Sequence, residues 1–281
     1  MTILAWHRHG TLPMEGPLEA LPLVLLHAFP FDATMWNDVV GELDDLPVLT
    51  VDAPGFGASP LLPGEPSLDA YAEAIVADLA ELGVGRAVVA GLSMGGYVAL
   101  AIAARWPALL IGLGLLDTKA EADSESARAN RSAMAVEAEG AAGNTVVLGL
   151  LEAGLSPITL ADRPAVVATV RAALEQAPVD GIAWAQRAMA ARPDRLATLE
   201  MISAPALVLR GAHDAMTGAE AARHLAGHLA HVDLVEIPEA GHLTHAEAPA
   251  AVAGALHALY LRSVRGLEVP APSAAGARSG R

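Results

Sequence analysis

The chain has 281 residues, 53% of them hydrophobic and 17% charged, which is enough apolar sequence to bury a large core and excludes a disordered polymer. A formal net charge of −15 would repel a phosphate backbone, so no nucleic acid partner is expected. The absence of cysteine excludes disulfides, Cys-ligated metals and a Cys nucleophile. The start of the sequence lacks the apolar core of a signal peptide, and the longest apolar run, around 108–116, is too short to span a bilayer. We therefore expect a soluble, cytoplasmic protein without membrane contact.

Short apolar runs alternate with longer amphipathic stretches, a pattern typical of βαβ units and a mainly parallel sheet. Strands are expected at Leu23–Leu26, Val48–Val51, Ala87–Ala90, Ile111–Leu116, Ala206–Leu209 and Leu234–Ile237. Most of them are nearly continuous in Val, Leu and Ile, which indicates strands covered by helices on both faces. An earlier run, Ile3–His7, alternates more and is expected to form an antiparallel edge strand.

Apolar residues at helical spacing predict helices at Leu68–Leu82, Met94–Trp106, Ala219–Leu229 and Thr244–Leu261. Ser67 is placed to cap the first of these, and Gly83 lies where that helix would stop. Pro107 should end the second. The predicted architecture is thus an α/β fold with a mostly parallel central sheet flanked by helices.

The alternation breaks between about residues 118 and 199, which are rich in Ala, Glu and Arg and read as several helices. Because the strand pattern resumes afterwards, we expect a helical cap inserted into a main domain of residues 1–264, in preference to a separate domain. Residues 265–281 are rich in Pro, Ala, Gly, Ser and Arg without apolar periodicity, and a disordered tail is predicted there.

The most informative motif is Gly91-Leu-Ser-Met-Gly95, which runs from an apolar strand directly into a helix. G-x-S-x-G in this setting describes a sharp turn that holds the Ser in a strained backbone conformation. Small residues are needed two positions before and after the Ser, because strand and helix backbones nearly touch there. The turn also brings Ser93 to a helix N-terminus, where N–H groups can meet developing negative charge. Ser93 is the predicted nucleophile.

A serine hydroxyl needs a base and an orienting carboxylate, which follow it in the chain in sites of this kind. Asp214 and His242 fall in that order, each just beyond a late strand, and are the predicted acid and base. Asp117 is the alternative acid, because it too ends a strand. His245 is a less favoured base, since it is expected to begin the last helix.

Acyl transfer also needs hydrogen-bond donors for the tetrahedral oxyanion. The backbone N–H of Met94, next to the nucleophile, is one predicted donor. The other should come from the loop 27–30 after the first buried strand; Pro30 has no N–H, so Phe29 is the expected donor. His27 is expected to hold this loop. The Gly/Pro-rich stretch 52–59 lacks the Lys of a P-loop, and we interpret it as a turn in which Asp52 bonds the backbone.

The segments HAFP at 27–30, DAPGFGAS at 52–59, GLSMGG at 91–96, GAHD at 211–214 and AGH at 240–242 together resemble the α/β-hydrolase superfamily, over roughly residues 2–263. GLSMGG and GHLTHAEAP are similar to the 3-oxoadipate enol-lactonase-like branch, and the same words recur in carboxylesterases and cofactor-free haloperoxidases. Ala28 departs from the Gly that is usual in the family. The resemblance implies a Ser-His-Asp mechanism on a small-molecule ester or lactone, through an acyl-enzyme and with no metal or organic cofactor.

Other reactions on the same triad stay open: a cofactor-free perhydrolase or haloperoxidase, a C–C bond hydrolase, or an acyltransferase. A ligand-binding receptor with vestigial turnover is less favoured, because the Ser, acid and His candidates are all present. The substrate is not predicted. Apolar candidates for the pocket are Trp36, Met134, Trp184 and Met189, and candidates for receiving a substrate carboxylate are Arg128, Arg131, Arg187 and Arg192.

Overall fold

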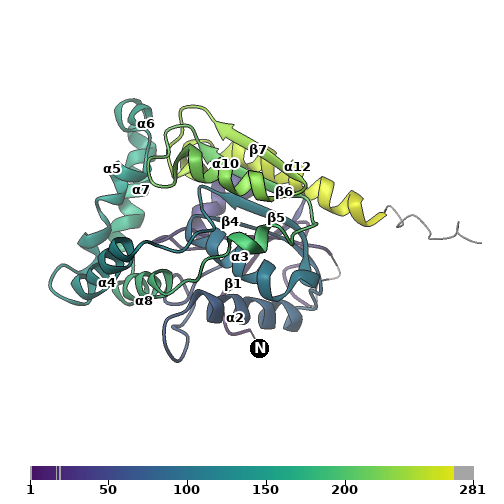
Figure 1. The fold of residues 1–281 in the computed structure, drawn as a ribbon, viewed down its shortest axis with the longest axis horizontal. Helices are drawn as coiled ribbons and strands as arrows, with labels where there is room; N and C mark the ends of the chain where they lie inside the picture. The colour runs from purple at the N-terminus through teal and green to yellow at the C-terminus, as the bar shows by residue number, and fades with distance from the viewer. Residues whose placement is uncertain (1, 17, 19, 269–281) are drawn as a thin grey trace, which may run out of the picture.

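A computed structural model describes residues 2–268 except 17 and 19. The described residues form a seven-stranded sheet in the order β1-β3-β2-β4-β5-β6-β7 (Figure 1). The strands are β1 (Trp6–Gly10), β2 (Leu23–Leu26), β3 (Pro47–Val51), β4 (Ala87–Leu92), β5 (Leu110–Leu116), β6 (Ala206–Gly211) and β7 (Val232–Ile237). β1 pairs antiparallel with β3, and the other neighbouring pairs are parallel. The predicted α/β fold with a mostly parallel sheet is confirmed.

The six predicted strands all form, with ends that move by two residues at most. Five of them are buried, whereas β7 lies at the end of the sheet and is largely exposed, with Leu234 at 47%. The edge strand forms too, but further along the chain than the predicted Ile3–His7. The reason lies in the backbone amides of Ile3 and Leu4, which donate to the Asp78 carboxylate at 2.6 and 2.8 Å. Those amides are therefore satisfied before the chain reaches β3, and pairing with β3 begins at Trp6.

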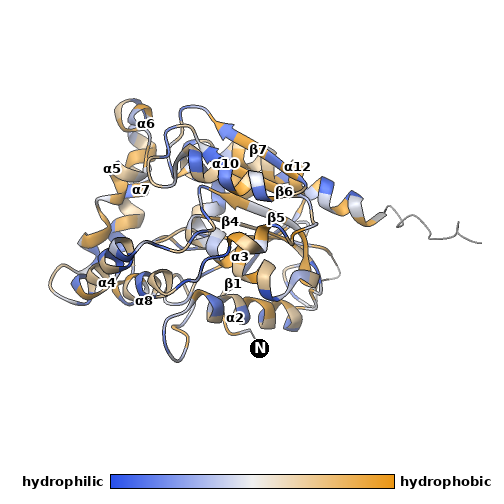
Figure 2. Ribbon diagram, viewed as in Figure 1, coloured by the Kyte–Doolittle hydropathy of each residue, from blue (hydrophilic) through white to orange (hydrophobic). Residues whose placement is uncertain are grey.

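Helices cover both faces of the sheet, because successive residues of each strand point to opposite sides. One face, with Val24 and Leu26 of β2, packs against α2 (Leu68–Glu81), α3 (Met94–Arg105) and α10 (Gly218–His228). The other, with Leu23 and Leu25, packs against α1 (Asn37–Gly41) and α12 (Pro249–Glu268). Figure 2 shows the apolar strands enclosed between helices that carry blue polar positions. Among the residues described, no helix is both long and apolar enough to cross a membrane.

Residues 118–205, all of them described, connect β5 to β6 through helices. These are α4 (Glu125–Glu139), η3 (Gly143–Val147), α5 (Leu150–Gly154), α6 (Pro157–Asp162), α7 (Pro164–Gln176), α8 (Val179–Ala190) and α9 (Leu196–Leu199). In Figure 1, α4 to α8 lie together at the left of the view, beside the sheet. We use "the helical segment" for residues 118–199, the range for which a cap is predicted.

The prediction of one helix over Thr244–Leu261 is wrong. Two helices form instead, α11 (Thr244–Glu247) and α12, which begins at Pro249. Proline lacks an N–H and disfavours helical geometry in the residue before it, and Ala248 accordingly has φ −146° and ψ 57°. Residues 265–268, the first residues of the predicted disordered tail, belong to α12. The rest of that prediction, 269–281, lies outside the described residues.

Candidate active site

The turn at Ser93 has the geometry that its glycines predict. Ser93 joins β4 to α3 with φ 53° and ψ −109°, a sparsely populated combination for a residue with a side chain. A methyl group on Gly91 would collide with the backbone of Gly95, and one on Gly95 with the carbonyl of Leu26. Strand and helix can therefore approach this closely only through glycine, and the approach leaves Ser93 half-buried at the start of α3.

Ser93 opens into a pocket of about 240 Å³ that His242 also lines. Phe29 and Phe31 come from the loop after β2, and Lys119 from the residues that follow β5. The helical segment contributes one wall, including Arg131, Met134, Gln186 and Met189, and the loops that carry Asp214 and His242 add Met216, Thr217 and Leu243. Nucleophile and base candidates, far apart in sequence, thus face one cavity.

His242 is buried and hydrogen bonded to Asp214 at 3.1 Å between Nδ1 and Oδ1. Asp214 lies just after β6 and also accepts bonds from the Met216 N–H at 2.8 Å and from the Thr217 hydroxyl. Burial opposes ionisation of Asp214, but these bonds outweigh it and lower its pKa to about 2. An ionised Asp214 accepts from Nδ1–H, which leaves Nε2 of the neutral imidazole free to act as a base.

Burial disfavours the imidazolium form of His242, whereas the bond to Asp214 and the negative charges of Asp214 and Asp117 favour it. The favourable interactions are larger, so the pKa of His242 lies above its usual value. A base whose pKa is raised by a fixed carboxylate is suited to taking a proton from a hydroxyl and passing it to a leaving group.

Asp117, the alternative acid, is buried beside this pair but bonds elsewhere. Its Oδ1 accepts from the Gly211 N–H at 2.8 Å, and its Oδ2 from the Thr244 hydroxyl at 2.6 Å. Ligand atoms of Asp117, Asp214 and His242 lie within 4.8 Å of one another, and in the described part of the chain they form the sole group of three that could hold a metal ion. Protein hydrogen bonds already occupy both oxygens of Asp117 and one nitrogen of His242, which fits proton transfer better than metal binding.

The two expected oxyanion donors follow adjacent strands. Met94 is the first residue of α3, so its N–H has no partner within the helix. Phe29 follows β2, whose Leu26 pairs with Gly91 of β4. His27 holds the loop 27–30 after β2, as predicted. Its Nε2 accepts from the Ala53 N–H at 2.7 Å, and its Nδ1 donates to the Ala28 carbonyl at 3.0 Å. The peptide bond Phe29–Pro30 is cis.

Known proteins share the sequence pattern and the fold of this chain. A profile of the alpha/beta hydrolase family matches residues 23–255. The chain belongs to this family. It is 32% identical over 246 residues, covering 83% of this chain and 89% of the relative, to a 2-succinyl-6-hydroxy-2,4-cyclohexadiene-1-carboxylate synthase of an Enterobacter strain. It is 28% identical over 254 residues, covering 88% and 91%, to 3-oxoadipate enol-lactonase 2 of Acinetobacter baylyi.

Among solved structures, a thermophilic esterase from Thermogutta terrifontis, described with malate bound, superposes with a TM-score of 0.86. It shares 36% identity, and the match covers 93% of each chain. The resemblance drawn from the motifs is thus confirmed for the family and for its esterase and enol-lactonase relatives.

The hydrolase also carries a group of cations beside the pocket that sequence reasoning found in part. Asp123 is buried and bonded to Arg131 at 2.6 Å, Arg192 at 2.7 Å and Lys119 at 3.3 Å. Hydrogen bonds from the two guanidinium groups outweigh burial and hold the pKa of Asp123 far below its usual value. Lys119 was not predicted. Lys119 lies two residues after Asp117, on the side of the sheet where the parallel strands end and where Ser93 lies, here called the sheet edge. This position is the signal that could have identified it.

The other pocket predictions divide. Met134 and Met189 line the pocket, whereas Trp36 and Trp184 are buried in the core of the hydrolase. Of the four arginines, Arg131 lines the pocket and Arg192 lies behind it, stacked on Tyr97. Arg187 pairs with Glu139 on the surface, and Arg128 is exposed. Sequence periodicity identifies buried apolar positions but does not separate a cavity wall from a packed core.

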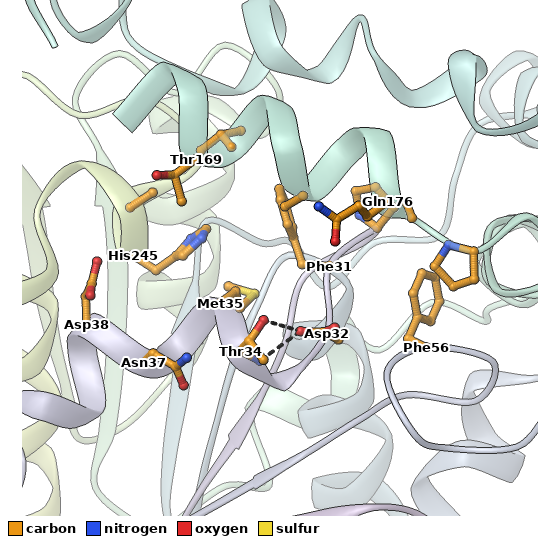
Figure 3. Close-up of a pocket in the computed structure, with 16 residues that line it drawn as sticks. Phe31, Asp32, Thr34, Met35, Asn37, Asp38, Phe56, Thr169, Gln176 and His245 are labelled. Carbon is orange, nitrogen blue, oxygen red and sulfur yellow. Dashed lines mark hydrogen bonds between the residues drawn. The ribbon is translucent and has the colours of Figure 1, made fainter. Parts of the chain in front are cut away.

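Two further predictions are resolved away from the pocket. Asp52 bonds the backbone N–H groups of Ala33 at 2.9 Å and Ala58 at 3.0 Å, as expected for a structural turn. His245 is buried and packs edge-on against Phe31, with ring centroids 5.7 Å apart. It lines a second pocket of about 410 Å³, drawn in Figure 3, to which Ser93 does not contribute. Phe31 lines both pockets, so its ring stands between them.

Proposed function

We propose that this hydrolase cleaves a small-to-medium carboxylic ester or lactone, with Ser93 as nucleophile, His242 as base and Asp214 as the acid that orients it. One observation carries the proposal. Ser93, held in a strained turn, opens into the same pocket as His242, and Nδ1 of His242 is bonded to the buried Asp214. Asp214 is preferred to Asp117 because it makes the bond to Nδ1.

In the proposed reaction, the Ser93 hydroxyl attacks the carbonyl carbon while Nε2 of His242 takes its proton. The N–H groups of Phe29 and Met94 stabilise the oxyanion. When the tetrahedral intermediate collapses, the C–O bond of the leaving group breaks and His242 returns the proton to the alcohol. A water molecule, deprotonated by His242, then attacks the acyl-enzyme and releases the acid and Ser93. No step requires a metal or an organic cofactor.

The pocket favours a substrate that carries its own carboxylate. Lys119 and Arg131 line the pocket and share a single carboxylate, Asp123, with Arg192. One negative charge thus faces three positive ones, which leaves positive charge for a bound anion to compensate. The carboxylate in the name of the synthase relative, the 3-oxoadipate of the lactonase relative and the malate of the esterase structure point the same way.

A second candidate function is a different reaction on the same triad, in keeping with the synthase relative of similar length. Perhydrolysis, haloperoxidation, C–C bond hydrolysis and acyl transfer would all start from the same Ser93 alkoxide. Perhydrolysis and haloperoxidation would replace the attacking water with hydrogen peroxide, and acyl transfer would replace it with another acceptor. C–C bond hydrolysis would keep the water and cleave a carbon–carbon bond. A receptor without turnover would have no need of a base oriented by a buried carboxylate.

The test compares hydrolysis of p-nitrophenyl acetate and of monoesters of small diacids by the wild type, Ser93→Ala and Ser203→Ala. Loss of the nucleophile should reduce kcat/KM by at least about 10³-fold. Ser203 is exposed and does not line the pocket that contains Ser93, so its variant should match the wild type. A fluorophosphonate should add one equivalent to the wild type and none to Ser93→Ala.

Equal ester turnover in all three proteins would overturn the proposal. Labelling at Ser93 without ester turnover would instead indicate the second candidate function, a different reaction from the same nucleophile.

A further inference from the structure

The proposed reaction leaves one buried acidic group unused. Asp117 directly follows β5, is 1% exposed and has φ 43°, a left-handed conformation uncommon for a residue with a side chain. Burying a carboxyl group costs free energy unless its oxygens are bonded. Here one oxygen accepts from Gly211, the last residue of β6, and the other from Thr244, the first residue of α11.

These two bonds tie together the segments that carry the acid and the base. Gly211 is three residues before Asp214, and Thr244 is two residues after His242. Asp117 thus spans both loops from the neighbouring strand. A neutral hydrogen-bonding side chain could make such a connection without the cost of a buried charge, so the carboxyl group calls for a second explanation.

The explanation lies in its distance to the imidazole. An oxygen of Asp117 lies within 4.8 Å of a ring nitrogen of His242 and of an oxygen of Asp214. At that separation, in a site shielded from water, a negative charge interacts strongly with the imidazolium. The other titratable groups near His242 are His245 and Glu247 of α11, and Lys119 and Arg131 across the pocket.

We propose that Asp117 is a positioning residue of the catalytic centre, whose charge supports the His242 imidazolium alongside Asp214. This rests on the proposed function of His242 as base. Asp117 touches no reacting atom and acts through His242. Where Asp117 is ionised, two carboxylates in place of one compensate the positive charge that forms when His242 takes the proton of Ser93.

The pH dependence follows from the sign of that charge. Burial is the main cause that raises the pKa of Asp117, to about 7, with a further contribution from Asp214. Asp117 and His242 therefore titrate as a coupled pair in the neutral range. A neutral residue at 117 would disfavour the imidazolium and lower the pKa of His242. The acid limb of kcat/KM, which reports protonation of the base, should then move to lower pH.

Asp117→Asn tests this, because Asn tolerates a left-handed conformation and its side-chain carbonyl can still accept from Gly211. We expect the midpoint of the acid limb of kcat/KM to move to lower pH by about one unit. On the plateau, kcat should drop by about 3- to 10-fold because the base is weaker. An acid limb at the wild-type pH in a folded Asp117→Asn would overturn the proposal, whatever happens to the rate.

A second readout needs no turnover. The His242 imidazole can be titrated by NMR, with its signals assigned by their loss in His242→Asn. The pKa measured in Asp117→Asn should be lower than in the wild type by the same shift. Because this measurement does not depend on ester hydrolysis, it separates failure of the present proposal from failure of the proposed function. An unchanged imidazole pKa would refute the role of Asp117 even in an active esterase.

Thr244 supplies a variant that leaves the carboxyl group in place, should Asp117→Asn not fold. Thr244→Val removes the hydrogen bond that favours the ionised form of Asp117, so the pKa of Asp117 rises and it is neutral over a wider pH range. The midpoint of the acid limb should then move to lower pH, but by less than in Asp117→Asn. Thr244→Ser keeps the hydroxyl and should restore the wild-type profile. A purely structural role predicts altered thermal stability with no movement of either limb.

Discussion

The sheet edge and the helical segment contribute to the same pocket in different ways. At the sheet edge, Ser93, Asp214 and Asp117 each stand within three residues of the end of a parallel strand. In the helical segment, Arg131 and Met134 reach the pocket with long side chains from α4. Short side chains on a hydrogen-bonded strand end are fixed by the backbone, whereas long side chains on a helix depend on their partners. The first arrangement suits chemistry and the second suits recognition.

The largest effect should follow from a change at the sheet edge. Asp214→Asn removes the carboxylate that holds His242 in the Nδ1–H tautomer, and should lower kcat by about 10³-fold or more with little change in KM. Asp233→Asn, on the exposed surface of β7, is the matched control and should stay within two-fold of the wild type. Steady-state kinetics on one activated ester decides this. A drop of less than ten-fold would shift the acid role to Asp117.

A change in the helical segment should affect recognition and leave the chemistry. Arg131→Gln removes a pocket cation that is 22% exposed, and should raise KM for a monoester of a diacid by about ten-fold. For a neutral ester of the same size, KM should change less than two-fold.

Arg187→Gln is the control in the same segment, since Arg187 pairs with Glu139 on the surface and does not line the pocket. Equal effects of Arg131→Gln on charged and neutral esters would contradict a carboxylate-binding role.

The smallest effect should come from a change at Phe31, which lines both pockets. Phe31→Leu shortens the side chain that lines both cavities, and should raise the ratio of kcat/KM for a bulky ester to that for an acetate by about 3-fold (Figure 3). Esters of graded acyl and alcohol length would show which portion of the substrate lies toward His245. A ratio unchanged for every ester would mean that the second pocket is not reached from Ser93.

The same contrast explains what could be predicted from sequence. The Ser93 turn, its two glycines and the strand-end positions of Asp214 and His242 depend on neighbours within a few residues, and local patterns record such dependence. The pairing of Asp123 with Arg192 depends on how the start of α4 meets the end of α8, which no local pattern encodes. The apolar character of Trp184 suggests burial, but it does not say which side of α8 faces the cavity.

Boundaries failed for a related reason. The edge strand moved because Asp78, more than seventy residues away in α2, claims the amides of Ile3 and Leu4. The last predicted helix is divided at Pro249, a signal that lies within the sequence itself. A short stretch of sequence does not show which distant residues compete for its backbone hydrogen bonds.

The sharing of Asp123 among three cations couples ligand binding to the stability of the fold. With the pocket empty, Lys119 and Arg131 repel each other and Arg192 across a single carboxylate; an anion seated beside them relieves that repulsion. Whatever binds the folded chain and not the unfolded one raises the melting temperature in proportion to the logarithm of its concentration. The melting temperature of the protein therefore reports ligand binding. Small diacids ranked by the rise in melting temperature that they cause would indicate which acid the pocket fits, without any assay for the reaction.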